Sequence, residues 1–199
     1  MAGVFPISNS KFQTLGIKSV QKTLLSKSAS GKRFARQIDG QRFSFTANII
    51  TAKRSDVYGE LMAFIMKQRS SKETFTIVPP EISNARGTAS GTPNGTASAG
   101  DTSITLGGTG TGTLLSGDYI KFANHDKIYM VVADQSDIST GTITIEPPLR
   151  EAVSSSDITY DSVPFTVYLV NEMQEFGGIG ADKDGNVLYK FELDVEESL

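Results

Sequence analysis

The 199-residue sequence has no cysteine and only one histidine, His125. The absence of cysteine excludes disulfide frameworks, thiolate metal sites and cysteine nucleophiles, and it fits assembly in a reducing cytoplasm. A single histidine excludes any metal site built on two of them. His125 lies in the turn sequence FANHDK, where we expect a solvated side chain.

Long apolar runs are also missing, which excludes a membrane-spanning helix. The first residues, MAGVFPISNSKFQTLG, have no cationic flank before an apolar core, so we expect no signal peptide and no membrane insertion. We expect Glu196 and Glu197, near the end of the sequence, to be solvated carboxylates. Four aspartates are too widely spaced for an EF-hand loop: Asp118, Asp126, Asp134 and Asp137. No constellation indicates an active site, so we expect no enzyme activity, no cofactor and no bound metal.

The net charge of −3 conceals an asymmetry. Residues 1–80 hold 13 Lys and Arg against 4 Asp and Glu, a net of +9, whereas residues 81–199 hold 6 against 18, a net of −12. Such a split would let the basic half of one copy meet the acidic half of another. The alternative is that the charges of the two halves lie on ordinary solvated surfaces and take part in no contact between copies.

The first 80 residues predict strands around one helix. Residues 18–25 mix β-branched residues with Lys and Gln, and residues 41–50 alternate in a half-buried pattern through Phe43, Phe45 and Ala47. The turn signal Asp39-Gly40 predicts that residues 32–38 pair with residues 41–50 as a hairpin. Apolar residues at helical spacing predict a helix over about 55–69, capped by Ser55 or Asp56. The run ETFTIVPPE then predicts a strand that stops at Pro79-Pro80.

The segment Gly87–Gly117 consists mostly of Gly, Thr and Ser, which make up 21 of its 31 residues. We expect residues 86–100 to be a flexible crossing and residues from 101 onward to begin a small β-barrel. Its GGTGTG run precedes a strand and not a helix, so it lacks the helix N-terminus that a dinucleotide site requires. Further strand signals separated by turns continue to the end, so the sequence predicts a mainly β protein with one helix.

The order of the predicted strands and helix over residues 18–81 resembles that of the tail-tube fold of bacteriophages. The resemblance is strongest to the distal tail proteins related to the lambda-type minor tail protein M. The residues that match this layout are Asp56, Val57, Tyr58, Phe64, Phe75, Pro79 and Pro80. A second stretch is similar to a small β module that recurs in phage tail and baseplate proteins. It is carried by Gly117, Asp118, Tyr129, Val131, Ala133, Asp134, Pro147, Pro148, Leu149 and Arg150.

The resemblance implies a β-sandwich of the tail-tube fold, made of residues 1–86 and 166–199, with a small barrel inserted at residues 87–165. It implies a structural protein of the virion tail, assembled in the host cytoplasm, that links tail tube to tail tip. Identical subunits would form a ring, typically hexameric, around a channel through which DNA passes without specific binding. Other tail proteins of the tube, hub and baseplate would be its partners.

Charge and resemblance together predict which residues border the subunit contact. They are Lys32, Arg33, Arg36 and Arg42 on one side and Asp194, Glu196 and Glu197 on the other. Two other functions stay open. The barrel could bind carbohydrate or a host surface through Tyr119, Phe122 and Tyr129 if these rings were exposed, although burial in a core is the expected state. A hydrolase of cell-wall polymer is the third hypothesis.

Overall fold

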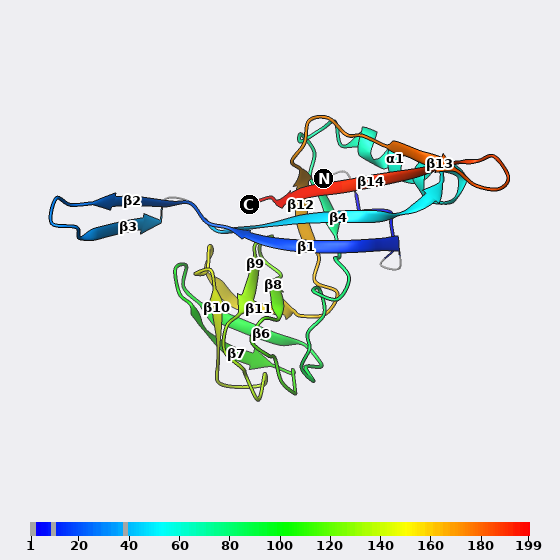
Figure 1. Cartoon of the computed structure of the whole chain (residues 1–199). Coiled ribbons are helices and arrows are strands. Elements are labelled where there is room, and N and C mark those ends of the chain that lie inside the picture. The colour runs from blue at the N-terminus through cyan, green and yellow to red at the C-terminus, as the bar shows by residue number, and fades with distance from the viewer. Residues whose placement is uncertain (1–2, 9–10, 38–39) are drawn as a thin grey trace.

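A computed structural model describes residues 3–8, 11–37 and 40–199. Strands account for 47% and helix for 8%, which confirms the expected mainly β class with one helix. The described strands form a six-stranded sheet, a closed six-stranded barrel and a separate two-stranded hairpin (Figure 1). In this part of the chain no helix is long and apolar enough to cross a membrane.

The six-stranded sheet is antiparallel and has the order β1-β4-β14-β12-β5, with β13 added on β14. Its strands are β1 (Phe12–Val20), β4 (Arg42–Lys53), β5 (Phe75–Ile77), β12 (Phe165–Leu169), β13 (Gly177–Ala181) and β14 (Val187–Glu197). The predicted alternation in β4 is confirmed, since Phe43, Phe45 and Ala47 are buried and the residues between them are not. Cross-strand pairs such as Phe45 with Val195 then form one apolar face.

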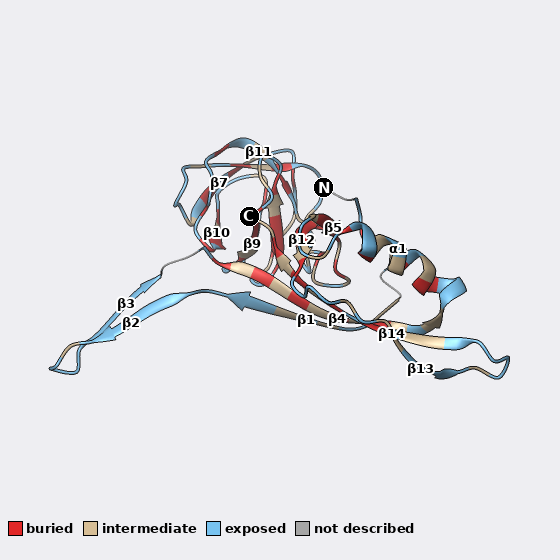
Figure 2. Ribbon diagram, turned by 90° about the horizontal axis from the view of Figure 1, so that it is seen from above, coloured by how far each residue is buried: buried red, intermediate tan, exposed pale blue. Residues whose placement is uncertain are grey.

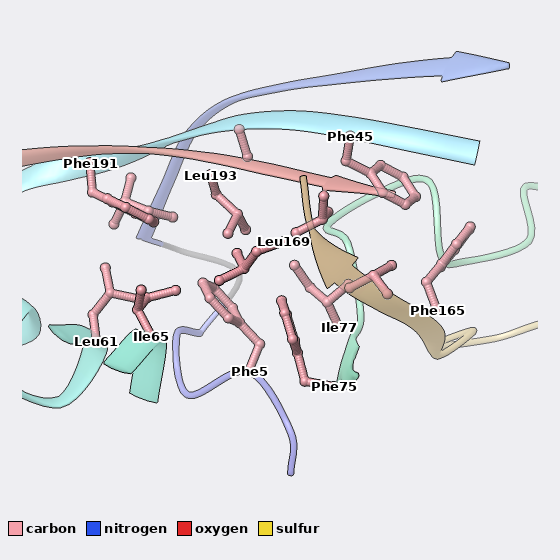
Figure 3. Close-up of a cluster of buried hydrophobic side chains, with 14 of the residues drawn as sticks. Phe5, Phe45, Leu61, Ile65, Phe75, Ile77, Phe165, Leu169, Phe191 and Leu193 are labelled. Carbon is pink, nitrogen blue, oxygen red and sulfur yellow. The ribbon is translucent and has the colours of Figure 1, made fainter. Parts of the chain in front are cut away.

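The helix packs against the apolar face of the sheet. It runs without interruption from η2 (Arg54–Tyr58) into α1 (Gly59–Lys67), close to the predicted span. The predicted cap is wrong, because Lys53 occupies that position and no side chain caps the helix. The core gathers side chains from the helix, the sheet and the N-terminal segment around Phe5 (Figure 3).

The predicted hairpin of residues 32–38 with residues 41–50 is wrong. The strands β2 (Thr23–Lys27) and β3 (Arg33–Gln37) pair with each other, while β4 pairs with β1 and β14. Residues 18–25, predicted as one strand, are therefore shared between β1 and β2. The reason is burial: β1 brings Leu15 and Ile17 against the core, whereas β3 is rich in cations. Asp39 of the expected turn lies outside the described residues.

The expected small barrel is present, and it is closed in the order β10-β7-β6-β11-β8-β9. Its strands are β6 (Pro93–Ala97), β7 (Ser103–Gly108), β8 (Tyr119–Phe122), β9 (Ile128–Val131), β10 (Thr142–Glu146) and β11 (Val153–Thr159). They surround a separate apolar core that includes Ile104, Phe122 and Ile143. The barrel strands all lie between β5 and β12 of the sheet, which is the arrangement of an insertion. Independent folding of the two parts stays a prediction.

The Gly/Thr-rich segment is largely barrel wall. Residues 93–97, expected to belong to a crossing, form β6, and Ser90 is bridged to Thr111 in a continuing ribbon. The two backbones approach so closely that a side chain at Gly87 or Gly112 would collide with the carbonyl group of the opposite segment. Glycine is required for this close approach, which explains the composition better than linker flexibility does.

Candidate assembly surface

The hairpin β2–β3, called the arm from here on, projects from the rest of the molecule (Figure 1). Every residue of its two strands is exposed, including Leu24 (60%), Leu25 (57%) and Phe34 (52%). Within the described residues its strands pair only with each other. An isolated two-stranded hairpin is marginally stable in water, and exposed apolar side chains in a group mark interaction sites. The arm is thus a candidate surface for contact with another molecule.

Both faces of the arm combine apolar and cationic side chains. On one face Phe34 lies opposite Ser26, and Arg36 lies opposite Leu24. The ammonium group of Lys32 lies 5.5 Å from the centre of the Phe34 ring. The other face pairs Leu25 with Ala35 and Lys27 with Arg33. Since residues 23–37 contain no acidic side chain, the arm favours an acidic partner with an apolar centre.

The structure brings three of the predicted contact residues together on the arm: Lys32, Arg33 and Arg36. It places Arg42 elsewhere, in β4, where Nη1 donates to Oε1 of Glu196 at 3.1 Å. The phenol of Tyr168 donates to the same oxygen at 2.9 Å. Part of the charge complementarity between the two halves of the sequence is therefore satisfied within one chain.

The acidic residues predicted for the contact have different environments. Asp194 is partly exposed and accepts a hydrogen bond from the side chain of Asn171 at 3.0 Å. Glu197 is fully buried, so the reading of it as solvated charge is wrong. The alternation in β14 could have revealed this, because Phe191, Leu193 and Val195 are buried and Glu197 continues their period of two. The carboxylate of Glu197 is used inside the chain.

The face of the long strands opposite the core is uncovered and polar. Figure 2 shows the barrel and α1 on the same side of β1, β4 and β14, so the other side of these strands lies open. Side chains there form cross-strand rows: Thr14, Asn48 and Glu192 in one, and Lys18, Ser44 and Glu196 in another. This face carries charges of both signs around a centre of hydroxyl and amide groups.

The three aromatic residues on which the carbohydrate hypothesis relies are not on the barrel surface. Tyr119, Phe122 and Tyr129 are buried, as expected for core residues. Burial raises the pKa of Tyr129 to about 12. Its hydroxyl accepts a hydrogen bond from the Arg150 backbone at 2.9 Å and lies 2.8 Å from Nε2 of His125. The alternative of a glycan-binding barrel therefore has no exposed ring among these three.

His125 is partly buried, so the expectation of a solvated side chain is wrong. Its ring stacks on Phe122, and Nδ1 lies 3.0 Å from the side-chain oxygen of Asn124. A neutral imidazole with its proton on Nδ1 donates to Asn124 and accepts from Tyr129. Burial lowers the pKa of His125 below its usual 6.5, and Asp126 and Glu151 oppose that shift. The residue supports the barrel wall.

Candidate chemistry is sparse in the described part of the chain. Residues 3–8, 11–37 and 40–199 contain no group of three or more side chains of the kinds that hold a metal ion. A cavity of about 490 Å³ opens between the base of the arm and the barrel, lined in part by Gln41, Arg42, Pro147 and Arg150. Its lining is a mixture of prolines and cations without a nucleophile beside a base.

Comparison with known proteins gives no family: no protein-family model and no curated protein matches this chain. A mainly β fold hosts many unrelated functions, so the fold by itself does not assign one. The exposed arm, the open polar face and the outer edge of β1 are the candidate functional surfaces.

Proposed function

We propose that this chain is a structural component of a bacteriophage tail, a ring-forming distal tail or baseplate protein that links the tail tube to the tail tip. The arm is the observation that carries the proposal. It exposes three large apolar side chains, has four cations, and its two strands pair with no other strand of the described chain. A second copy of the same chain supplies the missing cover, since the second half of the sequence is strongly acidic.

The sheet edge supports the same proposal. β1 is the last strand in the sheet order, and no described strand pairs with its outer edge. An open edge of nine residues offers unpaired backbone groups to another chain. When the surface that binds and the surface that is bound differ, successive copies join head to tail, and such contacts close into a ring under rotational symmetry. The resemblance to tail-tube proteins makes that ring a hexamer.

The open polar face of β1, β4 and β14 is the face that we assign to the channel. It carries polar side chains and is not covered by the barrel or the helix (Figure 2). The cations Lys18 and Arg42 share this face with three carboxylates, those of Glu192, Asp194 and Glu196, and Arg42 is ion-paired with Glu196. The face therefore has no cationic stripe that would hold DNA. DNA would pass such a wall without specific binding. The virion tail and its tube, hub and baseplate proteins are the proposed location and partners.

The test is assembly of the purified chain. Light scattering coupled to size-exclusion chromatography and negative-stain images should show rings of a single size, alone or after mixing with tail proteins. The matched control replaces the three exposed apolar residues of the arm, Leu24, Leu25 and Phe34, by Ser. This variant should remain folded and monomeric. A wild-type chain that stays monomeric under both conditions would contradict the proposed function.

A further inference from the structure

Two side chains of the barrel reach into the core of the sheet at the junction. Tyr119 and Ile128 belong to barrel strands, yet both pack in the core of the sheet. The Tyr119 ring centre lies 5.2 Å from that of Phe43 and 5.9 Å from that of Phe165. The barrel is therefore docked on the sheet and not suspended from it.

A single carboxylate lies at the centre of this junction. Oε1 of Glu197 accepts a hydrogen bond from the Ile128 backbone at 2.7 Å. Oε2 accepts one from the Phe43 backbone at 3.1 Å and one from Nζ of Lys127 at 2.6 Å. Glu197 extends from β14, Phe43 is in β4, and the other two donors are at the start of β9. One side chain of the sheet thus bonds to a neighbouring sheet strand and to the barrel at once.

The partner cation extends the network further. Lys127 is buried, and its ammonium group also donates to the side chain of Gln41 at 2.9 Å and lies 4.9 Å from the centre of the Phe43 ring. Gln41 donates to the hydroxyl of Ser19 in β1 at 3.0 Å. Burial lowers the pKa of Lys127, and the Glu197 carboxylate opposes this shift. A buried ion pair contributes little net stability but makes other arrangements costly.

The two chain segments that lead into and out of the barrel meet at a second place. Ala85 donates its backbone N–H to Tyr160, and Val163 donates to Ser83, at 2.9 and 2.8 Å. The backbone of Ser162 adds a bond to the side chain of Asn84 at 2.9 Å. The hydrogen bonds that join these connectors, residues 83–86 and 160–163, are between neutral groups, while Arg86 at the end of the first connector is ion-paired with Asp118 of the barrel at 3.1 Å. The connectors would stay paired if the barrel rotated about them.

We propose that Glu197 is a latch that holds the barrel in one orientation on the sheet, with the paired connectors as the hinge about which the barrel moves when the latch is open. The latch acts through geometry, since it joins three donors from two parts of the molecule. This inference does not depend on ring formation, because it concerns one copy of the chain.

The experiment compares Glu197→Ala with Glu196→Ala, its neighbour on the opposite face of β14. Residue-resolved hydrogen exchange should show faster exchange at the amides of Phe43 and Ile128 in the first variant only. The amides of Val131 and Ile145, which bond within the barrel, should keep their protection in both variants. Small-angle scattering of the monomeric arm variant should show a larger maximum dimension once Glu197→Ala is added.

Two results would overturn the proposal. One is unchanged exchange at Phe43 and Ile128 in Glu197→Ala. The other is faster exchange that is equal throughout sheet and barrel, which would make Glu197 a residue required for folding. If Glu197→Ala does not fold, Glu197→Gln replaces it, because Gln retains an acceptor oxygen. In that variant the amides of Phe43 and Ile128 should exchange faster than in wild type. Exchange at the wild-type rates would again overturn the proposal.

Discussion

In the arm, Lys32 lies over the ring of Phe34 at 5.5 Å and both side chains are exposed; at the junction, Lys127 lies over the ring of Phe43 at 4.9 Å and both are buried. The pairs have the same chemistry. The junction pair is surrounded by Glu197, Gln41 and Tyr119. The arm pair has no comparable set of neighbours in the described chain. The junction is therefore complete in one copy, whereas the exposed arm is where we propose that another molecule binds.

The largest difference should appear when each region is removed. Excising residues 88–164 with a short joining linker should leave a folded but less stable sheet, since Phe43 and Phe165 lose their contact with Tyr119. Deleting residues 23–37 with a similar linker should leave the free energy of unfolding of the monomer nearly unchanged. Urea denaturation of both products measures this contrast. A molten or insoluble product of the first excision would contradict the insertion arrangement.

Single lysine substitutions sharpen the contrast. Lys127→Ala should cost about 3–5 kcal/mol of unfolding free energy, because it leaves the Glu197 carboxylate buried without its cation. Lys32→Ala should change it by less than about 0.5 kcal/mol, since that side chain is exposed. Chemical denaturation of the two variants at one pH gives both values. Equal costs would mean that the arm is packed in the monomer.

Local patterns in the sequence predict the elements of this fold better than their partners. The period of two in Phe43, Phe45 and Ala47 and the helical spacing around Leu61 depend on neighbours in the chain, and both predictions are confirmed. The partner of β4 depends on which other strand offers an apolar face. Since β1 supplies that face, a local turn signal was insufficient to identify the pairing.

The functional surfaces divide in the same way. Clustering of Lys32, Arg33 and Arg36 follows from their spacing in the chain, and the structure places them on one hairpin. The sequence did not predict the contact between Lys127 and Glu197, because these residues are 70 positions apart. Even so, the alternation of β14 already put Glu197 on the buried side, and a buried carboxylate requires a partner.

Charge reversal on the arm should have a moderate effect on assembly. Arg33→Glu with Arg36→Glu should weaken self-association most strongly at low salt, with each exposed pair contributing at most about 1 kcal/mol. Lys67→Glu with Arg69→Glu makes the same change of charge outside the arm and should have no such effect. Sedimentation velocity over a series of salt concentrations separates the two variants. Identical association of both at low salt would exclude an electrostatic role for the arm.

The smallest expected effect is a pH dependence of the unfolding free energy that originates in the barrel. Burial lowers the folded-state pKa of His125 below 6.5, so the unfolded chain binds the proton more tightly. The stability that neutral His125 contributes is present above pH 6.5 and is lost as the pH falls through the folded-state pKa. His125→Gln should remove that part of the slope in urea midpoints plotted against pH. An identical slope in the variant would show that other groups cause it.

The central claim, that the arm is covered by a second copy, can be tested most directly by crosslinking. The chain has no cysteine, so Phe34→Cys supplies a single attachment point for a photoreactive crosslinker on the arm. Irradiation should join the arm to a different copy of the chain, and mass spectrometry of mixed isotope-labelled copies should place the site in its acidic half. Crosslinks confined to the same copy, or none under conditions where wild type assembles, would contradict the account.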